Sequence, residues 1–322
     1  MQLRYLSYQD VASVGMSMTE IVSAVEDVFR EKGEGRVEMP PKPGIHTQPD
    51  AFIHAMPAHV PAMQAAGMKW VSGYPGNQKK GLPYITGLMI LNDPDTGIPT
   101  AVMDAVWITA MRTGAATAVG AKYLARPDSE TVAILGCGVQ GRSNLDALRV
   151  VLPNLRQVRA YDVVPEGQSR FLDEAAEEYG LEPHPSTTPE DAVREADVIV
   201  TAGPILKNPS PVIQTSWLKP GAFISPVDFD SYVKGEVFQA AAKLYTDDLS
   251  QQAYYAEHGY FKDTPTPAGD LGELVTGKKP GRETDDELTI SLNLGLALED
   301  MAVGVRVLRA AAERNIGTLL DL

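Results

Sequence analysis

The stretch Thr131-Val-Ala-Ile-Leu-Gly-Cys-Gly-Val-Gln-Gly141 decides the fold of this chain. Its uncharged apolar run, Val132 to Leu135, is typical of a buried parallel strand. The run ends at Gly136-x-Gly138-x-x-Gly141, after which apolar residues recur at helical spacing: Leu145, Leu148, Val151 and Leu152. A strand, a glycine turn and a helix in this order predict the first βαβ unit of a doubly wound parallel sheet.

Each glycine of the turn has a separate mechanical role. Gly136 allows the tight turn, Gly138 lets a pyrophosphate approach the backbone, and Gly141 lets the helix pack close to the strand. Asp162 ends the next strand-like run, 162 − 136 = 26 residues after the first glycine. A carboxylate at this place binds a ribose diol and repels a 2′-phosphate, so the sequence predicts NAD(H) as cofactor. The alternative is an exposed strand-end aspartate that binds nothing.

Composition excludes several classes of partner. The chain has 322 residues, of which 44% are hydrophobic, so we expect about two domains. A net charge of −14 argues against nucleic acid and against anionic membrane surfaces as partners. No apolar run approaches the roughly 18 residues that span a bilayer, and the N-terminal residues do not have the layout of a signal peptide. We therefore expect a cytoplasmic protein.

The segments before the glycine turn predict a different kind of domain. Residues 8–30 carry an amphipathic helical pattern with a polar start at Ser17 or Thr19, and residues 36–60 are rich in proline, which suits extended strands and turns. Short β-type runs follow between 67 and 106 and predict an antiparallel or mixed sheet. An alanine-rich helix then spans 109–124.

The second half of the chain completes the α/β prediction. Strand and helix signals alternate after residue 125, which indicates a parallel sheet with crossover helices. Residues 289–315 have the pattern of one long apolar-striped helix, which we expect to pack on the first domain. The predicted fold class is thus α/β. A Rossmann-type domain spans 125–302, and a second, α+β domain spans 1–124 and is completed by 303–322.

Two cations outside the nucleotide-binding domain are candidates for substrate binding. Lys69 and Arg112 each lie among apolar residues, and a buried cation requires an anionic partner. An Arg fork together with an ammonium suits a small carboxylate. The alternative is a pair of internal salt bridges to acids such as Asp104.

Acids after a strand of the second domain are candidates for proton transfer. Asp228 and Asp230 follow an apolar run, at the strand end where ligands bind in such sheets. A carboxylate there exchanges a proton with a substrate amine or imine, whereas a loop-capping role is the alternative. The histidines outside this region have no metal-ligand spacing, so we expect no metal site: His46, His59, His184 and His258.

At family level, the chain resembles the ornithine cyclodeaminase/mu-crystallin family. The stretches that carry the resemblance run nearly end to end: Met56-Pro-Ala58, Gly67-Met-Lys-Trp-Val-Ser72, Asn77, the turn Asn92–Gly97, Thr109–Ala116, Ile134–Gly141, Lys219-Pro-Gly221 and Gly295–Asp300. The resemblance implies a homodimer in which residues 1–124 with the final helix form the substrate-binding and dimerisation domain. It also implies that the Rossmann domain binds NAD(H) or NADP(H).

The resemblance further assigns roles to single residues. It implies that Lys69, also a catalytic candidate, and Arg112 bind the substrate α-carboxylate, with Lys42 near another basic position. Asp230 matches the family's catalytic aspartate because it keeps a spacing of four to Lys234 and of six to Glu236. Residues that match cofactor-contacting positions are Thr113, Val139, Gln140, Asp162, Gly203, Val227, Lys234 and Asn293.

The substrate pocket departs from the cyclodeaminase pattern. His54 stands where ornithine cyclodeaminases have a glutamate that holds the substrate's side-chain amine. We therefore expect an NAD(H)-dependent amino-acid dehydrogenase or ketimine reductase that acts at the α-carbon of a small amino or imino acid. Redox-neutral cyclodeamination of ornithine is the first alternative. A non-catalytic, mu-crystallin-like binding protein is the second.

Overall fold

The computed structural model describes residues 1–322, apart from the side chain of Gln78. The chain divides into two compact units: Met1–Arg112 with Gly295–Leu322, and Thr113–Leu294. The first division falls inside helix α3 (Val106–Leu124). The boundary that we expected after residue 124 corresponds instead to the C-terminal end of this helix.

The first unit contains a mixed seven-stranded sheet. Its strand order is β15-β1-β6-β5-β4-β3-β2, in which β1 and β6 are parallel and the other neighbours are antiparallel. The strands are β1 (Gln2–Leu6), β2 (Gly44–Ile45), β3 (Phe52–Val60), β4 (Ala65–Gly73), β5 (Ile85–Asn92), β6 (Pro99–Asp104) and β15 (Thr318–Asp321). Short 3-10 helices η1 (Pro61–Met63) and η2 (Pro75–Lys80) follow β3 and β4.

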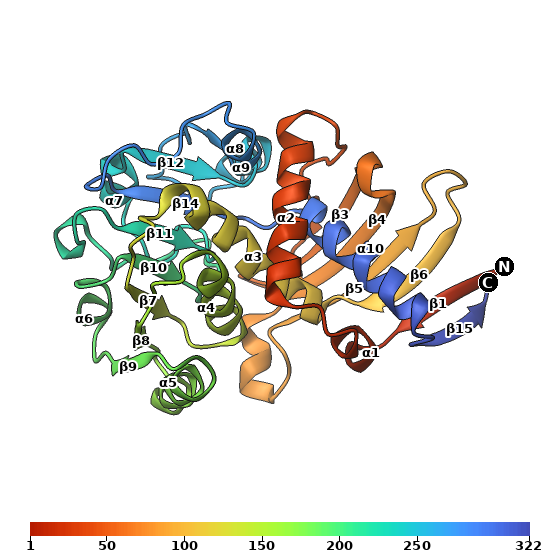
Figure 1. The fold of residues 1–322 in the computed structure, drawn as a ribbon, viewed down its shortest axis with the longest axis horizontal. Helices are drawn as coiled ribbons and strands as arrows, with labels where there is room; N and C mark the ends of the chain where they lie inside the picture. Colours follow the sequence, from red (N-terminus) through yellow and green to blue (C-terminus); the bar gives the residue numbers. More distant parts are fainter. The chain divides into compact units, whose positions relative to one another are not determined.

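Helices α2 (Met18–Gly33) and α10 (Ala297–Glu313) lie side by side on one face of this sheet (Figure 1). Ser17 caps α2 in a capping box with Glu20, which confirms one of the two predicted caps. Gly304 lets α10 approach β5, because a Cβ there would lie 2.4 Å from the Cε of Met89. The short helix α1 (Tyr8–Ser13) precedes α2, so the amphipathic segment 8–30 forms two helices.

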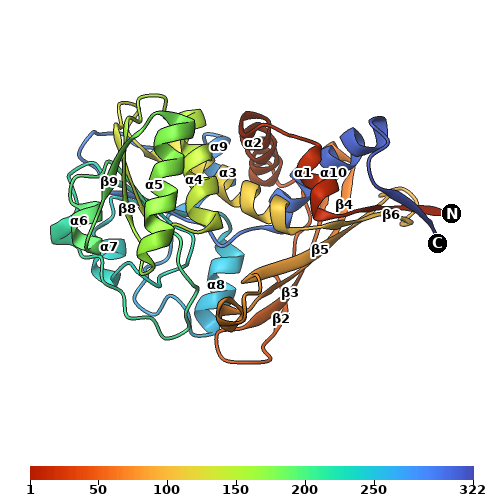
Figure 2. The same cartoon turned by 90° about the horizontal axis from the view of Figure 1, so that it is seen from below.

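The opposite face of the sheet is partly open. Trp70 of β4 and Leu88 of β5 are paired neighbours on this face, and they are 44% and 45% exposed. Figure 2 shows α2 and α10 together on the other side of β3, β4 and β5. The alternation along β4 therefore separates the buried Lys69 from the exposed Trp70.

The second unit contains an eight-stranded parallel sheet in the order β13-β12-β14-β11-β10-β7-β8-β9, with alternating helices (Figure 1). This topology confirms the predicted α/β class. The strands are β7 (Thr131–Leu135), β8 (Gln157–Tyr161), β9 (Glu182–Pro185), β10 (Val198–Thr201), β11 (Phe223–Pro226), β12 (Lys243–Thr246), β13 (Gly269–Asp270) and β14 (Thr289–Leu292). The helices are α4 (Val139–Val151), α5 (Pro165–Tyr179), α6 (Pro189–Val193), η3 (Thr215–Trp217), α7 (Gly235–Ala240), α8 (Leu249–Glu257) and α9 (Leu271–Val275).

The prediction of one long helix over 289–315 is wrong. Residues 289–292 form β14, a fully buried strand between β11 and β12, and the helix begins only at Ala297. The alternation of Thr289 and Ser291 with Ile290 and Leu292 covers only four residues, too few to outweigh the helical pattern that follows, and pairing in the sheet decides the structure of this segment. Gly295, with φ of +80°, lies between the two elements.

No helix in the described part of the chain is long and apolar enough to cross a membrane.

Candidate active site

The glycine turn joins β7 to α4, and each of its glycines has different surroundings. Gly136 has φ of +100°, and a Cβ there would lie 2.6 Å from the carbonyl oxygen of Ala202. A Cβ on Gly141 would lie 2.3 Å from the carbonyl oxygen of Gly136, so this glycine lets the helix pack close. A Cβ on Gly138 would meet nothing within 4 Å beyond its chain neighbours, which leaves open space at the start of α4. These surroundings confirm the tight turn and the close packing.

Asp162 follows β8 and is tied to the glycine turn. Its Oδ2 accepts a hydrogen bond of 2.7 Å from the backbone N–H of Cys137, and its Oδ1 accepts one of 2.9 Å from Val164. Burial and the neighbouring Asp162 carboxylate raise the pKa of the Cys137 thiol to about 12. Cys137 is therefore an unreactive part of the turn. The Asp162 carboxylate links the end of β8 to the turn that follows β7.

In the first unit, Lys69 and Arg112 form a buried ion cluster with two acids of α10. Lys69 Nζ lies 2.8 Å from Asp300 Oδ1 and 2.7 Å from Oδ2. Arg112 donates to Glu299 Oε2 at 2.7 Å from NH1 and to Asp300 Oδ1 at 3.1 Å from Nε. Lys69, Glu299 and Asp300 are 0% exposed. Desolvation, with the charge of Arg112, lowers the pKa of Lys69 to about 7 even though Asp300 opposes the shift.

Internal salt bridges are the alternative expected for these cations, and such bridges exist. Their acids are Glu299 and Asp300, whereas Asp104 accepts a hydrogen bond from the N–H of Val106 at the start of α3. Neither partner was predicted from the sequence. The available signal was two adjacent acids in the otherwise apolar run Leu296–Val303, where a helix N-terminus favours negative charge.

Lys42 and His54 lie in the same region of the first unit. The buried Lys42 donates from Nζ to the carbonyl oxygen of Gly295 at 3.1 Å. Gly295 also adjoins the Arg112 guanidinium, since a Cβ there would lie 2.5 Å from NH1. His54 stacks on Phe52, and burial together with the charges of Lys42, His46 and Lys69 lowers its pKa to about 3. The structure therefore brings all four predicted substrate-binding residues together, with His54 neutral.

The two candidate aspartates of the second unit have different surroundings. Asp228 is fully buried, accepts hydrogen bonds from Thr201 Oγ1 at 2.7 Å and from the N–H of Gly203 at 2.8 Å, and has a pKa raised to about 7 by burial. Asp230 is less buried, and desolvation raises its pKa. Its Oδ1 has no hydrogen-bond partner among the described residues. Between them, Phe229 has φ of +64°, a left-handed conformation that is uncommon for a residue with a side chain.

The other residues predicted to contact the cofactor differ in burial and in hydrogen bonding. Val139 is exposed at the start of α4, next to Gln140. Lys234 donates to Gln214 Oε1 at 2.9 Å. The buried Asn293 amide donates to Thr117 and Ser225 and accepts from Ser291. The remaining three are partly buried: Thr113 in α3, Gly203 after β10 and Val227 after β11. Among the described residues, no group of three or more His, Cys, Asp or Glu side chains is arranged to hold a metal ion.

A parallel sheet with this glycine turn defines the second unit as a Rossmann-type dinucleotide-binding domain. The first unit adds a buried cluster of two cations and two acids. The chain belongs to the ornithine cyclodeaminase/mu-crystallin family, whose model matches residues 4–315.

Named relatives match over nearly the full chain. The alanine dehydrogenase of Archaeoglobus fulgidus is 38% identical over 330 aligned residues, which cover 99% of this chain and 98% of the relative. The structure of Thermococcus litoralis Δ1-pyrroline-2-carboxylate reductase in complex with NADH and L-proline has a TM-score of 0.88 at 32% identity, covering 98% and 99% of the two chains. An archaeal alanine dehydrogenase dimer with bound NAD has a TM-score of 0.89 at 36% identity and covers both chains completely.

Proposed function

We propose that this protein is an NAD(H)-dependent oxidoreductase that acts at the α-carbon of a small amino or imino acid, as an amino-acid dehydrogenase or ketimine reductase. The observation that carries the proposal is the buried pair Lys69 and Arg112 in a chain that also has the glycine turn. The pair suits an organic carboxylate. Relatives that match over the whole chain include an alanine dehydrogenase and a pyrroline-carboxylate reductase, and also a lysine cyclodeaminase at 29% identity.

The second unit has features that fit NAD(H). Helix α4 begins at Gly138 without a side chain that caps its first amides, so these N–H groups are available to a pyrophosphate. The open space at Gly138 leaves room for this contact. Asp162 would hold the adenosine ribose diol from the adjacent strand end. When bound there, NAD(H) would supply the capacity to give or take a hydride.

The residues of the first unit position the substrate. Arg112, Lys69 and Lys42 would bind its α-carboxylate, because all three are buried cations near Gly295 and the start of α10. This orientation of the α-carbon is itself a large part of catalysis. Asp230 is the proposed proton carrier for the substrate nitrogen, and Lys69, with a pKa near 7, is suited to proton transfer as well.

His54 favours a dehydrogenase or reductase over an ornithine cyclodeaminase. A pKa of about 3 makes this side chain neutral at physiological pH. The positive charges of Lys42 and Lys69 also act on the His54 side chain and help to lower its pKa. A substrate side chain that ends in an ammonium would therefore meet no carboxylate at His54 and would be repelled by Lys42.

Substrate screening with NADH absorbance tests the proposal. Purified protein is assayed with NAD⁺ and a panel of L-amino acids, and with NADH and keto acids plus ammonia or methylamine. We expect NADH to change in proportion to turnover with at least one small substrate. Ammonia release from ornithine without net NADH would identify a cyclodeaminase, and NADH binding without any turnover would identify a binding protein.

The proton carrier is tested by two matched substitutions. Asp230→Asn should slow turnover by roughly 10²–10⁴-fold if Asp230 is the acid/base group, while Asp228→Asn should have the smaller effect. The reverse order would assign the role to Asp228, whose pKa near 7 also suits it.

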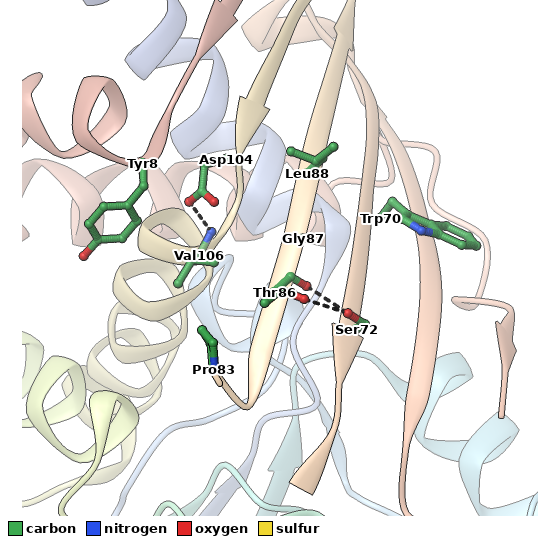
Figure 3. Close-up of a pocket in the computed structure, with 9 residues that line it drawn as sticks. All are labelled: Tyr8, Trp70, Ser72, Pro83, Thr86, Gly87, Leu88, Asp104 and Val106. Carbon is green, nitrogen blue, oxygen red and sulfur yellow. Dashed lines mark hydrogen bonds between the residues drawn. The ribbon is translucent and has the colours of Figure 1, made fainter. Parts of the chain in front are cut away.

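We also propose that the protein forms a homodimer through the open face of the first unit's sheet. Figure 3 shows this face, where Trp70 and Leu88 project from neighbouring strands. The residues that line its depression are Tyr8, Trp70, Ser72, Pro83, Thr86, Gly87, Leu88, Asp104 and Val106. Exposed aromatic and aliphatic side chains of this kind mark interfaces, and the archaeal relative is a dimer.

Light scattering tests the dimer. Leu88→Lys should convert it to a monomer, whereas Ile45→Lys, at a somewhat more exposed position of β2, should not. A monomeric wild-type protein at micromolar concentration would refute the dimer. We propose a cytoplasmic location for this assembly, supported by a chain that has a single cysteine and therefore does not depend on intrachain disulfides.

A further inference from the structure

The two acids of the buried ion cluster differ in how well they are held. Asp300 contacts two cations, since Oδ1 accepts from Arg112 Nε and both oxygens lie within 2.8 Å of Lys69 Nζ. Glu299 contacts one cation, at 2.7 Å through Oε2, and its Oε1 has no hydrogen-bond partner among the described residues. Both acids are completely buried. Glu299 is therefore the less stabilised anion of the pair.

An incoming substrate carboxylate would add a third anion to this cluster. Unit charges a few ångströms apart interact strongly where water is excluded, and a buried carboxylate relieves such repulsion by taking up a proton. The added proton is expected on Glu299, because this acid accepts hydrogen bonds from fewer donors than Asp300 does. Burial and the adjacent Asp300 already raise the pKa of Glu299, against the opposing effect of Arg112.

We propose that Glu299 takes up one proton when a carboxylate substrate binds beside Arg112. The proton comes from the solvent, so free enzyme with ionised Glu299, the carboxylate and one H⁺ give the complex with neutral Glu299. Arg112 then transfers its NH1 hydrogen bond from one anion to another. The inference rests on the proposed function, because it places the substrate carboxylate at this guanidinium.

The neighbouring charges leave Glu299 as the group that responds. Asp300 lies between two cations, Lys69 and Arg112, and His54 stays neutral because its pKa is about 3. The cluster itself is surrounded by Arg112 of α3, Lys69 of β4, and Lys42 before β2. Other elements near α10 contribute ionisable groups along the helix: His54 and His59 of β3, Asp10 of α1, and Asp27 of α2. Asp27 pairs with Arg306 of α10. Of these, Lys69 also titrates near neutral pH.

Calorimetry measures the proton directly. Pyruvate, which has one carboxylate and no amine, is titrated into the NAD⁺-saturated protein in buffers of different ionisation enthalpy, at several values between pH 5 and 9. The slope of the observed enthalpy against the buffer's ionisation enthalpy gives the protons taken up. Because Lys69 contributes to both proteins, the measured quantity is the difference between wild type and Glu299→Gln.

We expect the wild type to take up at least about half a proton more than Glu299→Gln at one or more of these pH values. The wild type's Kd for pyruvate should rise toward tenfold per pH unit above the pKa of Glu299 in the free protein, in addition to the rise that deprotonation of Lys69 causes in both proteins, and the variant should show only the Lys69 part. Glu313→Gln, an exposed acid of the same helix, should behave like wild type. Equal proton numbers for wild type and Glu299→Gln at every pH would overturn the proposal.

Infrared spectroscopy of the wild-type protein gives a second measurement that does not depend on a variant. With ¹³C-labelled glutamate, pyruvate binding should convert a glutamate carboxylate band into a protonated carboxyl band, and a spectrum without this change would refute the proton uptake. If neither pyruvate nor longer keto acids bind the NAD⁺-saturated protein and no substrate turns over, the proposed function fails instead.

Discussion

The glycine turn and the ion cluster are both candidate binding sites, but they are built differently. The turn uses backbone atoms from one short segment, Gly136–Gly141, with Asp162 from the next strand. The cluster uses side chains from β4, α3 and α10, far apart in the sequence. A turn of this kind is specified locally, because glycine conformation and spacing suffice. An ion cluster is specified only when tertiary structure supplies each charge with its partner.

From this difference we expect substitutions in the ion cluster to reduce the free energy of unfolding more than substitutions in the glycine turn. Arg112→Ala leaves Glu299 buried without its cation, which should cost about 3–5 kcal/mol of the free energy of unfolding. If the substrate anion is buried there, binding should also weaken by roughly 2–5 kcal/mol. Denaturant unfolding and the Michaelis constant measure the two effects.

Arg306→Ala is the matched control for this change. Arg306 pairs with Asp27 at the surface of the same unit, so its loss should cost less than about 1 kcal/mol. Similar losses of unfolding free energy for the two variants would mean that the buried cluster stabilises the fold no more than a surface ion pair does.

A second prediction concerns the protonation of Lys69. Its ammonium loses its proton as pH rises through about 7, so kcat/KM should fall above this pH as the carboxylate loses a cation. Asp300 raises the pKa of Lys69, and Asp300→Asn should therefore move the fall about one pH unit toward acid. An unchanged pH profile in an active variant would show that Lys69 does not set it.

The same shift has a consequence for stability. The pKa of Lys69 is lower in the folded protein than its ordinary value of 10.5, so the unfolded chain binds more protons between about pH 7 and 10.5. The free energy of unfolding contributed by Lys69 is therefore least favourable below pH 7 and rises across this interval.

Sequence-based prediction succeeded for the locally specified glycine turn and failed for features that depend on tertiary structure. The strand, the turn and Asp162 could be predicted because each signal lies in the residues themselves. Burial of Lys69 and Arg112 could be predicted from their apolar neighbours, but the identity of Glu299 and Asp300 as partners required the position of α10. Strand β14 was taken for helix because its Thr-Ile-Ser-Leu alternation spans only four residues and adjoins the longer helical pattern of α10.

The turn itself offers a third test, with smaller effects. Gly136→Ala places a Cβ 2.6 Å from a backbone oxygen at a φ of +100°, and should cost about 1–3 kcal/mol of stability. Gly138→Ala meets no atom within 4 Å at φ of −81° and should change stability by less than about 1 kcal/mol. It should nevertheless weaken NADH binding at least about tenfold, since the methyl group fills the space left for the pyrophosphate. Thermal unfolding and NADH fluorescence titration separate the two outcomes.

The last prediction concerns Asp162, which accepts hydrogen bonds at the glycine turn and is the proposed ribose ligand. Asp162→Ala removes acceptors from the N–H groups of Cys137 and Val164, each bond contributing about 1 kcal/mol. Water can replace part of this at a half-exposed strand end, so the fold should survive while NADH affinity falls by roughly tenfold. Asp173→Ala, an exposed acid of α5, controls for the change in net charge. Because a carboxylate repels a 2′-phosphate, Asp162→Ala should weaken NADPH binding less than NADH binding. An unchanged ratio of the NADH and NADPH affinities would mean that Asp162 stabilises the turn through its hydrogen bonds but does not select the cofactor.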